Sequence, residues 1–335
     1  MNTNIQQRSV KILSTGKYLP KRTVTAQELA DKIGVSSRWI EKKSGVMVRH
    51  FVADETTSQM GAYAAKEALA DANLSSQDID CIVCANTVPE QGIPCTAVLI
   101  QRLLGISDSG IPAFDINATC LSFVAALDLL SYLIDFGRYS RVLIVSSEIA
   151  TIALDWSDHE SCTLFGDGAA AVIVEKSPAS DASAILASRI ETYSEGADLS
   201  QCLGGGNKHH PREYAIHPDR FVFQMKGRAV YRMASQILPG FLQRLFEPIG
   251  LSLADMHLVI PHQASLMSMR LIQKQLEIPE ESWMVIAHDH GNTMAASIPM
   301  ALHEAIRQGK LNRGDRALLL GTAAGLSVGG MVLKY

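Results

Sequence analysis

The chain has 335 residues, of which 47% are hydrophobic and 19% charged, and its formal net charge is −4. This length suggests roughly two domains or one large one, and the composition is ordinary for a soluble globular enzyme with a large core. The net charge argues against a general nucleic-acid binder. The six cysteines are too sparse for a disulfide scaffold and fit a reducing compartment. No apolar run reaches about 18 residues and no apolar signal core opens the chain, so we expect no membrane insertion and a cytoplasmic location.

The first clear elements are a helical pattern over 62–72 and an apolar strand within 74–83. Cys81 and Cys84 in this region have the C-x-x-C spacing of some metal sites. On a strand, residues three apart face opposite sides of the sheet, so we expect no shared metal there.

Cys120 follows a predicted short strand over 113–116 and precedes a predicted helix over 121–136. A sulfur beside the amides of a helix N-terminus is expected to have a lowered pKa, which favours the nucleophilic thiolate. A buried and inert cysteine is the common alternative. This segment alone leaves the choice open.

The chain contains an internal repeat. Residues 74–83 match 251–260 at an offset of 177, and 99–106 match 271–278 at an offset of 172. In each half a helical pattern precedes the repeated strand, over 62–72 and over 234–246. The second offset places Asn292 opposite Cys120, again at a turn that enters a helix.

Strands and helices alternate in each half, with closing strands predicted over 163–174 and 317–333. This alternation predicts an α/β fold with largely parallel sheets covered on both faces. The polar segment 175–182 divides the chain into an N-terminal half, 1–176, and a C-terminal half, 177–335. The segment 204–218 is interpreted as an exposed loop, and its adjacent His209 and His210 as loop residues rather than metal ligands.

His262 follows a predicted buried strand of the second half. A histidine at such a position is often structural, and Asn292 could merely cap its helix. The duplication nevertheless brings Cys120, His262 and Asn292 to equivalent strand ends, where active sites of α/β folds gather. Cysteine and histidine together form the minimal pair for acyl transfer.

These residues lie in five motifs that resemble the β-ketoacyl-[acyl-carrier-protein] synthase III family of the thiolase-like superfamily over essentially the whole chain. The motifs are Trp39-Ile-x-x-Lys-Ser-Gly-Val-x-x-Arg49, Asn117-Ala-Thr-Cys-Leu-Ser-Phe123, Leu164-Phe-Gly-Asp-Gly-Ala-Ala-Ala-Val172, Pro261-His-Gln-Ala-Ser265 and His290-Gly-Asn-Thr-Met-Ala-Ala-Ser297. The resemblance implies a five-layered αβαβα fold of two duplicated halves and a homodimer. It also implies an acyltransferase that starts fatty acid biosynthesis without a cofactor, with acyl-CoA and malonyl-acyl carrier protein as substrates.

By this resemblance, Cys120 takes an acyl group from acyl-CoA in a ping-pong reaction. The backbone amides of Cys120 and Ala324 would form the oxyanion hole. His262 and Asn292 would donate hydrogen bonds to the thioester oxygen of the malonyl group, which loses CO2 and attacks the acyl group.

Other positions match substrate contacts of the family. Trp39 would stack on the adenine of CoA, Lys43 would face a phosphate, and His159 would cover the other adenine face. Ile93 lies in the loop that caps the acyl pocket of the partner subunit, and its modest size hints at a longer or branched primer. Phe123 is expected to pack beneath the sulfur of Cys120.

Basic side chains on two predicted helix faces match an acidic partner. Arg228, Arg232, Arg270 and Lys274 would contact the acyl carrier protein, although solvated helix faces are an equal alternative. Asp167 is interpreted as a turn residue without a catalytic role.

Two rival functions stay open. A related ketosynthase or acyltransferase of a specialised, polyketide-like pathway is suggested by the unusual Thr119, Leu121, Ser265 and the turn at 323–324. A non-catalytic partner subunit is a second rival, against which the intact Cys120 argues.

Overall fold

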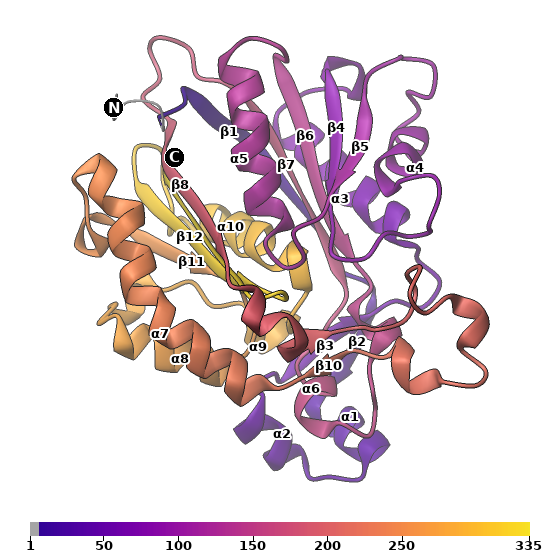
Figure 1. The fold of residues 1–335 in the computed structure, drawn as a ribbon. Coiled ribbons are helices and arrows are strands. Elements are labelled where there is room, and N and C mark those ends of the chain that lie inside the picture. Colours follow the sequence, from indigo (N-terminus) through magenta and orange to yellow (C-terminus); the bar gives the residue numbers. More distant parts are fainter. Residues whose placement is uncertain (1–6) are drawn as a thin grey trace.

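The computed structural model describes residues 7–335, which form two large β-sheets with helices between and outside them (Figure 1) and two small two-stranded sheets, β2-β3 and β9-β10. The first sheet has the order β1-β7-β6-β4-β5 and the second the order β11-β12-β13-β8. The strands of the first sheet are β1 (Val10–Tyr18), β4 (Cys81–Ala85), β5 (Ala113–Ile116), β6 (Arg141–Glu148) and β7 (Gly168–Lys176). Those of the second are β8 (Ala184–Thr192), β11 (Leu258–Pro261), β12 (Arg316–Ala323) and β13 (Ser327–Lys334).

The helices make three layers around the sheets. The outer layer of the first sheet is α3 (Thr57–Asp71) and α4 (Thr96–Leu103), the central layer α5 (Ser122–Asp135) and α10 (Ser297–Arg307), and the outer layer of the second sheet α7 (Gly227–Phe246) and α8 (Leu266–Gln275). Three separate hydrophobic clusters fill the spaces between these layers. The predicted five-layered α/β fold is therefore confirmed, with α5 and α10 between the two sheets (Figure 1) and the central cluster packed around them.

Shorter elements complete the chain. The short strands and helices are β2 (Arg22–Thr25), α1 (Ala26–Ile33), α2 (Ser37–Lys43), β3 (Val48–Phe51), α6 (His159–Cys162), β9 (Ser200–Gln201), β10 (Gln224–Met225) and α9 (Ala287–His290). The 3-10 turns are η2 (Ser76–Asp78), η3 (Ala150–Ala153), η4 (Ser194–Leu199), η5 (Pro211–Glu213), η6 (Pro218–Phe221), η7 (Glu247–Ile249), η8 (Leu253–Asp255), η9 (Glu280–Ser282) and η10 (Met294–Ala296). The group β2, β3, α1, α2 and α6 lies together at the lower end of the molecule in Figure 1.

The internal repeat is visible in matching capped turns. Ser75 donates its backbone N–H and its hydroxyl to Asp78 at 2.8 and 2.7 Å, and Ser252 does the same to Asp255 at 2.8 and 2.9 Å. Each turn leads into a buried strand, β4 or β11, beside which the next strands run in the same order. Four strands of each sheet thus repeat the same order, β4-β6-β7-β1 and β11-β12-β13-β8.

The sheets are mixed, so the prediction of largely parallel sheets is wrong. Strand β4 runs parallel to β5 and β6, and β11 runs parallel to β12, but the remaining pairs are antiparallel. The predicted closing strand over 317–333 is a hairpin, because Gly325 adopts φ 120° in the turn between β12 and β13. The strand predicted over 163–174 begins only at Gly168: Thr163 caps the end of α6, and Phe165 forms an isolated bridge with Asn292.

The two cysteines of the C-x-x-C spacing face opposite sides of β4, as predicted. Cys81 packs in the central hydrophobic cluster and Cys84 in the outer one. All six cysteines of the chain are free thiols. No helix within residues 7–335 is long and apolar enough to cross a membrane.

The polar segment at the predicted domain boundary lies between β7, which ends at Lys176, and β8, which begins at Ala184. Every strand of the first sheet precedes it and every strand of the second follows it. The division into domains 1–176 and 177–335 stays a prediction.

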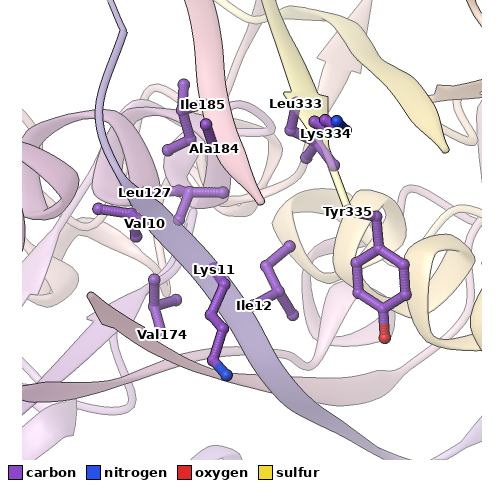
Figure 2. A pocket seen from close by; sticks show the side chains of 10 residues that line it. All are labelled: Val10, Lys11, Ile12, Leu127, Val174, Ala184, Ile185, Leu333, Lys334 and Tyr335. Atoms are coloured by element: carbon purple, nitrogen blue, oxygen red, sulfur yellow. The ribbon is translucent and has the colours of Figure 1, made fainter. Parts of the chain in front are cut away.

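Two cavities lie away from the start of α5. One, whose lining side chains are drawn in Figure 2, has a volume of about 10 Å³, which is room for no more than one water molecule. It is lined by Val10, Lys11, Ile12, Leu127, Val174, Ala184, Ile185, Leu333, Lys334 and Tyr335. The other, of about 350 Å³, is lined by Ile134, Gly137, Tyr139, Ser140, Arg141, Glu175, Lys176 and Pro178. Neither contains a predicted site residue.

Candidate active site

Cys120 lies at the junction between β5 and α5, with the flanking elements close to their predicted bounds. The residue before it, Thr119, adopts φ 51°, a left-handed conformation that is strained for a β-branched side chain. Asn117 accepts the Thr119 amide at 2.8 Å, and the Ser122 hydroxyl donates to the Thr119 carbonyl at 2.6 Å. These bonds hold the strained turn that presents the thiol.

The expected lowering of the Cys120 pKa is wrong. Burial raises the pKa of Cys120 to about 12, and the nearby Glu148 raises it too. The backbone amides of Ala324 and of Cys120 itself reach the sulfur and lower its pKa, but they do not outweigh burial. The resting group is therefore a thiol, with two amides already directed at the place where charge would develop.

Glu148 at the end of β6 was not predicted as part of the site. Its side chain is buried, and burial raises its pKa to about 8. The Thr87 amide donates to Glu148 Oε1 at 2.5 Å and lowers that pKa. The sequence signal is an acidic residue that closes a strand whose middle, 142–145, is apolar.

His262 follows β11 and is buried, which lowers its pKa to about 4. The imidazole is therefore neutral near pH 7. Its Nδ1 lies 2.6 Å from Ser297 Oγ, which also accepts the Gln263 amide at 3.3 Å. We assign the Ser297 hydroxyl as the donor to Nδ1, so that Nε2 carries the ring hydrogen and can donate into the site.

Gln263 next to it fixes the loop that leads to Asn292. Its side chain donates to the carbonyls of Pro261 and Met284 at 2.8 and 3.2 Å. Its oxygen accepts the amides of Ile286 and Ala287 at 2.9 and 3.1 Å. A fully satisfied buried amide of this kind rigidifies its surroundings.

Asn292 is held by both halves of the chain. Its backbone N–H donates to the Leu164 carbonyl at 2.7 Å, and its backbone carbonyl accepts the Gly166 N–H at 3.2 Å. The side-chain oxygen accepts the Met294 amide at 2.9 Å, so it caps the turn before α10. Nδ2 donates to the Ala264 carbonyl at 3.3 Å, which leaves its second hydrogen for another acceptor.

Contacts around Gly321 on β12 and around Ala264 link the surroundings of the three predicted residues. A Cβ on Gly321 would lie 3.0 Å from His262 Cβ and 3.1 Å from Leu121 Cδ2, so His262 and the neighbour of Cys120 flank this strand position. His262 and Asn292 in turn share the loop around Ala264. The Thr119 hydroxyl also reaches the Ala324 carbonyl at 3.4 Å.

The three residues predicted to bind the CoA nucleotide lie together. The rings of Trp39 on α2 and His159 on α6 are 6.3 Å apart and nearly perpendicular. Lys43 lies 3.8 Å from Glu160, and both are exposed, so this ion pair is weak and leaves the ammonium accessible.

Ile93 and Phe123 occupy opposite environments. The Ile93 side chain is 88% exposed, so it lines no buried pocket within one chain. Phe123 is fully buried in the central cluster on the first turn of α5, just after Cys120. Their roles in substrate binding stay predictions.

The four predicted carrier-protein contacts lie on the outer layer of the second half. Arg228 and Arg232 are exposed on α7, and Arg270 and Lys274 are exposed on α8. The two helices touch, because the Gln275 side chain donates to a carbonyl of α7 at 2.9 Å. Within residues 7–335 none of the four cations forms an ion pair, so they are available to an acidic partner.

Asp167 is more than a turn residue. It is fully buried and accepts the Val52 amide at 2.9 Å, and the amide and hydroxyl of Thr151 at 3.0 and 2.7 Å. It therefore joins three segments around the site, a role that its Gly-Asp-Gly setting did not reveal. In the described part of the chain, 7–335, no three His, Cys, Asp or Glu side chains gather to hold a metal ion.

Comparisons with known proteins agree with this geometry. The model of the family described as 3-Oxoacyl-[acyl-carrier-protein (ACP)] synthase III matches residues 114–194, and the model of its C-terminal part matches residues 246–335. β-Ketoacyl-[acyl-carrier-protein] synthase III of Aquifex aeolicus is 38% identical over 326 residues, covering 97% of this chain and 99% of that protein. The synthase III of Clostridium acetobutylicum is 32% identical, covering 98% and 99%.

Solved structures give the same result. The crystal structure of the Aquifex aeolicus enzyme matches with a TM-score of 0.87 at 37% identity, covering 97% of this chain and 100% of that one. The priming β-ketosynthase of the R1128 polyketide biosynthetic pathway matches with a TM-score of 0.88 at 30% identity, covering 98% and 96%. The chain therefore belongs to the 3-oxoacyl-[acyl-carrier-protein] synthase III family of condensing acyltransferases.

Proposed function

We propose that the chain condenses an acyl-CoA primer with malonyl-acyl carrier protein, with loss of CO2, at the start of fatty acid biosynthesis. The observation that carries this proposal is that His262 and Leu121, the residue after Cys120, both lie against Gly321, while Asn292 bonds to Ala264 in the loop after His262. Cys120 provides the thiol, and His262 and Asn292 provide neutral N–H groups.

In the first half-reaction, the sulfur of Cys120 attacks the carbonyl carbon of the primer thioester. A C–S bond to Cys120 forms, the C–S bond to CoA breaks, and the thiol proton leaves with the CoA sulfur. The amides of Cys120 and Ala324 face the reacting sulfur and would stabilise the tetrahedral oxyanion. The two amides thus stabilise negative charge during the reaction, which burial disfavours in the resting thiol.

In the second half-reaction, the malonyl thioester replaces CoA. Its bond to the carboxylate carbon breaks, CO2 leaves, and the electron pair forms an enolate on the thioester. The N–H groups of His262 Nε2 and Asn292 Nδ2 would stabilise the enolate oxygen without a metal. The enolate carbon then attacks the acyl carbonyl, a C–C bond forms, the C–S bond to Cys120 breaks, and the released sulfur takes a proton from solvent to restore the thiol.

Two binding regions support the substrates. Trp39 and His159 offer aromatic faces to the adenine of CoA, with Lys43 beside them for a phosphate. The unpaired cations of α7 and α8 suit the acidic acyl carrier protein.

We also propose a homodimer through the edge of the first sheet. Among residues 7–335, strand β5 pairs with β4 alone, so its other edge has open backbone groups. Phe114 on β5 and Ile93 in the nearby loop are exposed apolar side chains. A second copy would cover both, and Ile93 would then reach the partner's acyl pocket. Sedimentation of the protein should give twice the chain mass; a monomer at micromolar concentration would contradict the dimer.

The deciding experiment is CO2 release from malonyl-acyl carrier protein after addition of acyl-CoA. We expect release that depends on the primer, with one CO2 for each condensed product. Acyl transfer to another acceptor without CO2 would overturn the proposal.

The similarity to the R1128 priming enzyme supports a second candidate function, a specialised pathway with a longer or unusual primer. A primer panel separates the two. Strict preference for acetyl-CoA would exclude the second function, together with the longer or branched primer inferred from Ile93.

A further inference from the structure

Lys17 on β1 joins the first half to the second beside the candidate active site. Its Nζ lies 3.0 Å from His290 Nε2 and 2.5 Å from Glu304 Oε1. The Lys17 and Glu304 side chains are only 19% and 20% exposed, so solvent screens this pair less than a surface ion pair. The reaction proposed above uses none of these groups.

The contacts determine where the His290 ring carries its hydrogen. A lysine ammonium can only donate, so Nε2 of His290 must accept and the hydrogen must sit on Nδ1. Nδ1 lies 2.5 Å from Asp289 Oδ1 and donates to it. Burial raises the pKa of Asp289, but the His290 hydrogen bond and the charges around it lower that pKa overall. The ring, 7% exposed, is thus bound at both nitrogens.

His290 is two residues before Asn292, and the turn between them has little freedom. A Cβ on Gly166 would lie 2.2 Å from the His290 carbonyl oxygen, so the two backbones are in close contact. Gly291 adopts φ 71°, a left-handed conformation. The Asn292 amide then bonds to the first half. The turn therefore contacts the first half in two ways: its backbone packs against and bonds to 164–166, and its His290 ring bonds to Lys17.

We propose that Lys17 is a positioning residue for Asn292. Together with Glu304 it holds the His290 ring, and the ring sets the Gly291–Asn292 turn so that Nδ2 faces the malonyl thioester. The inference rests on the proposed role of Asn292 in the second half-reaction. Since Asn292 has no part in acylation of Cys120, Lys17 affects decarboxylation and leaves acylation unchanged.

The test compares Lys17→Met with Lys11→Met, the same change on the same strand. Lys11 forms ion pairs with Glu175 and Asp181 at 3.3 and 3.6 Å, away from the site. Acylation of Cys120 is followed by intact mass, and CO2 release is followed with malonyl-acyl carrier protein. For Lys17→Met we expect CO2 release about 10-fold slower, as for a slightly misplaced catalytic group, and acylation at the wild-type rate. Lys11→Met should match the wild type in both.

Equal loss of both half-reactions in Lys17→Met, or no loss in either, would overturn the inference. The double variant with Asn292→Ala should be no slower in CO2 release than Asn292→Ala alone, because both changes remove the same contribution. An additive loss would contradict a shared role.

A second readout separates this inference from the proposed function. If the wild type releases no CO2, the proposed function fails. Nitrogen NMR of labelled histidines then tests separately whether Lys17 holds the His290 ring. One ring protonated at Nδ1 in the wild type and altered in Lys17→Met supports it. Identical histidine spectra for both proteins would overturn it.

Discussion

The two halves of the chain carry different chemical groups at the same point of a duplicated fold. In the first half, Cys120 precedes α5; in the second, Asn292 precedes η10 and α10. A thiol can form a covalent bond to an acyl group, whereas an amide can only donate and accept hydrogen bonds. The difference shows how one repeated scaffold can provide both the nucleophile and the donors of a two-step reaction.

Burial favours the neutral form of the reactive side chain in both halves. It raises the pKa of Cys120 to about 12 and lowers that of His262 to about 4, so both groups are neutral near pH 7. A neutral imidazole is a suitable donor to an enolate oxygen. A neutral thiol, in contrast, needs the amides of Ala324 and Cys120 when it reacts.

The largest effect should come from removing the nucleophile of the first half. Cys120→Ala should lower condensation by about 1,000-fold or more, since no other group can form the acyl-enzyme. Cys95→Ala makes the same change in the same half and should keep the wild-type rate. Steady-state product formation measures both, and substantial turnover by Cys120→Ala would remove the basis of the comparison.

The join between the halves should be the next most sensitive point. In Gly166→Ala, the new Cβ would lie 2.2 Å from the His290 carbonyl oxygen, where neither backbone can easily move. We expect a loss of about 2–3 kcal/mol in the free energy of unfolding, as in other overpacked sites. Gly206→Ala has open space around its Cβ and is expected to stay within about 0.5 kcal/mol. Denaturant unfolding compares the stability of the two variants. Equal free energies of unfolding would contradict a tight backbone contact between Gly166 and His290.

Glu148 offers a test of burial in the first half through the pH dependence of stability. Its pKa is raised from 4.5 to about 8 in the folded protein, so between these values the folded state holds a proton that the unfolded state has lost. Stability contributed by this proton is complete below about pH 4.5 and is lost as the pH rises to about 8. The Glu148→Gln variant should lack this fall. Unfolding midpoints that change with pH identically in both proteins would contradict it.

The same variant should give the smallest effect, on the reactivity of Cys120. The negative charge of Glu148 raises the pKa of the thiol, so Glu148→Gln should lower that pKa. Alkylation of Cys120 by iodoacetamide near pH 9 should be a few-fold faster, in line with a small pKa shift. Slower alkylation in the variant would show that Glu148 acts on the thiol in another way.

Local patterns predicted much of the fold. The strand before Cys120 was placed at its observed bounds, and the following helix within one residue at each end. The repeat and the two faces of β4 also followed from sequence, and the family resemblance assigned Trp39 and His159 to one binding region, where their rings lie 6.3 Å apart. These features depend on periodicity, spacing or motif.

The rest depends on contacts between distant parts of the chain. The pKa of Cys120 was predicted in the wrong direction, because helix position is visible in the sequence and burial between two sheets is not. The run 317–333 was predicted as a closing strand although a turn was expected at 323–324, because the antiparallel pairing of β12 with β13 around Gly325 has no signal of its own in the sequence. The bonds from Lys17 to His290 and from Asp167 to Thr151 join segments that carry no mutual signal in one sequence.

The division of labour between the halves is tested most directly by intact-mass measurement after incubation with a mixed acyl-CoA pool. Wild type and Asn292→Ala should each gain one acyl group on Cys120, and Cys120→Ala should gain none. Malonyl-acyl carrier protein should then discharge the acyl group from the wild type, but about 100-fold more slowly from Asn292→Ala. Failure of Asn292→Ala to be acylated, or discharge at the wild-type rate, would contradict the separation of the two steps between Cys120 and Asn292.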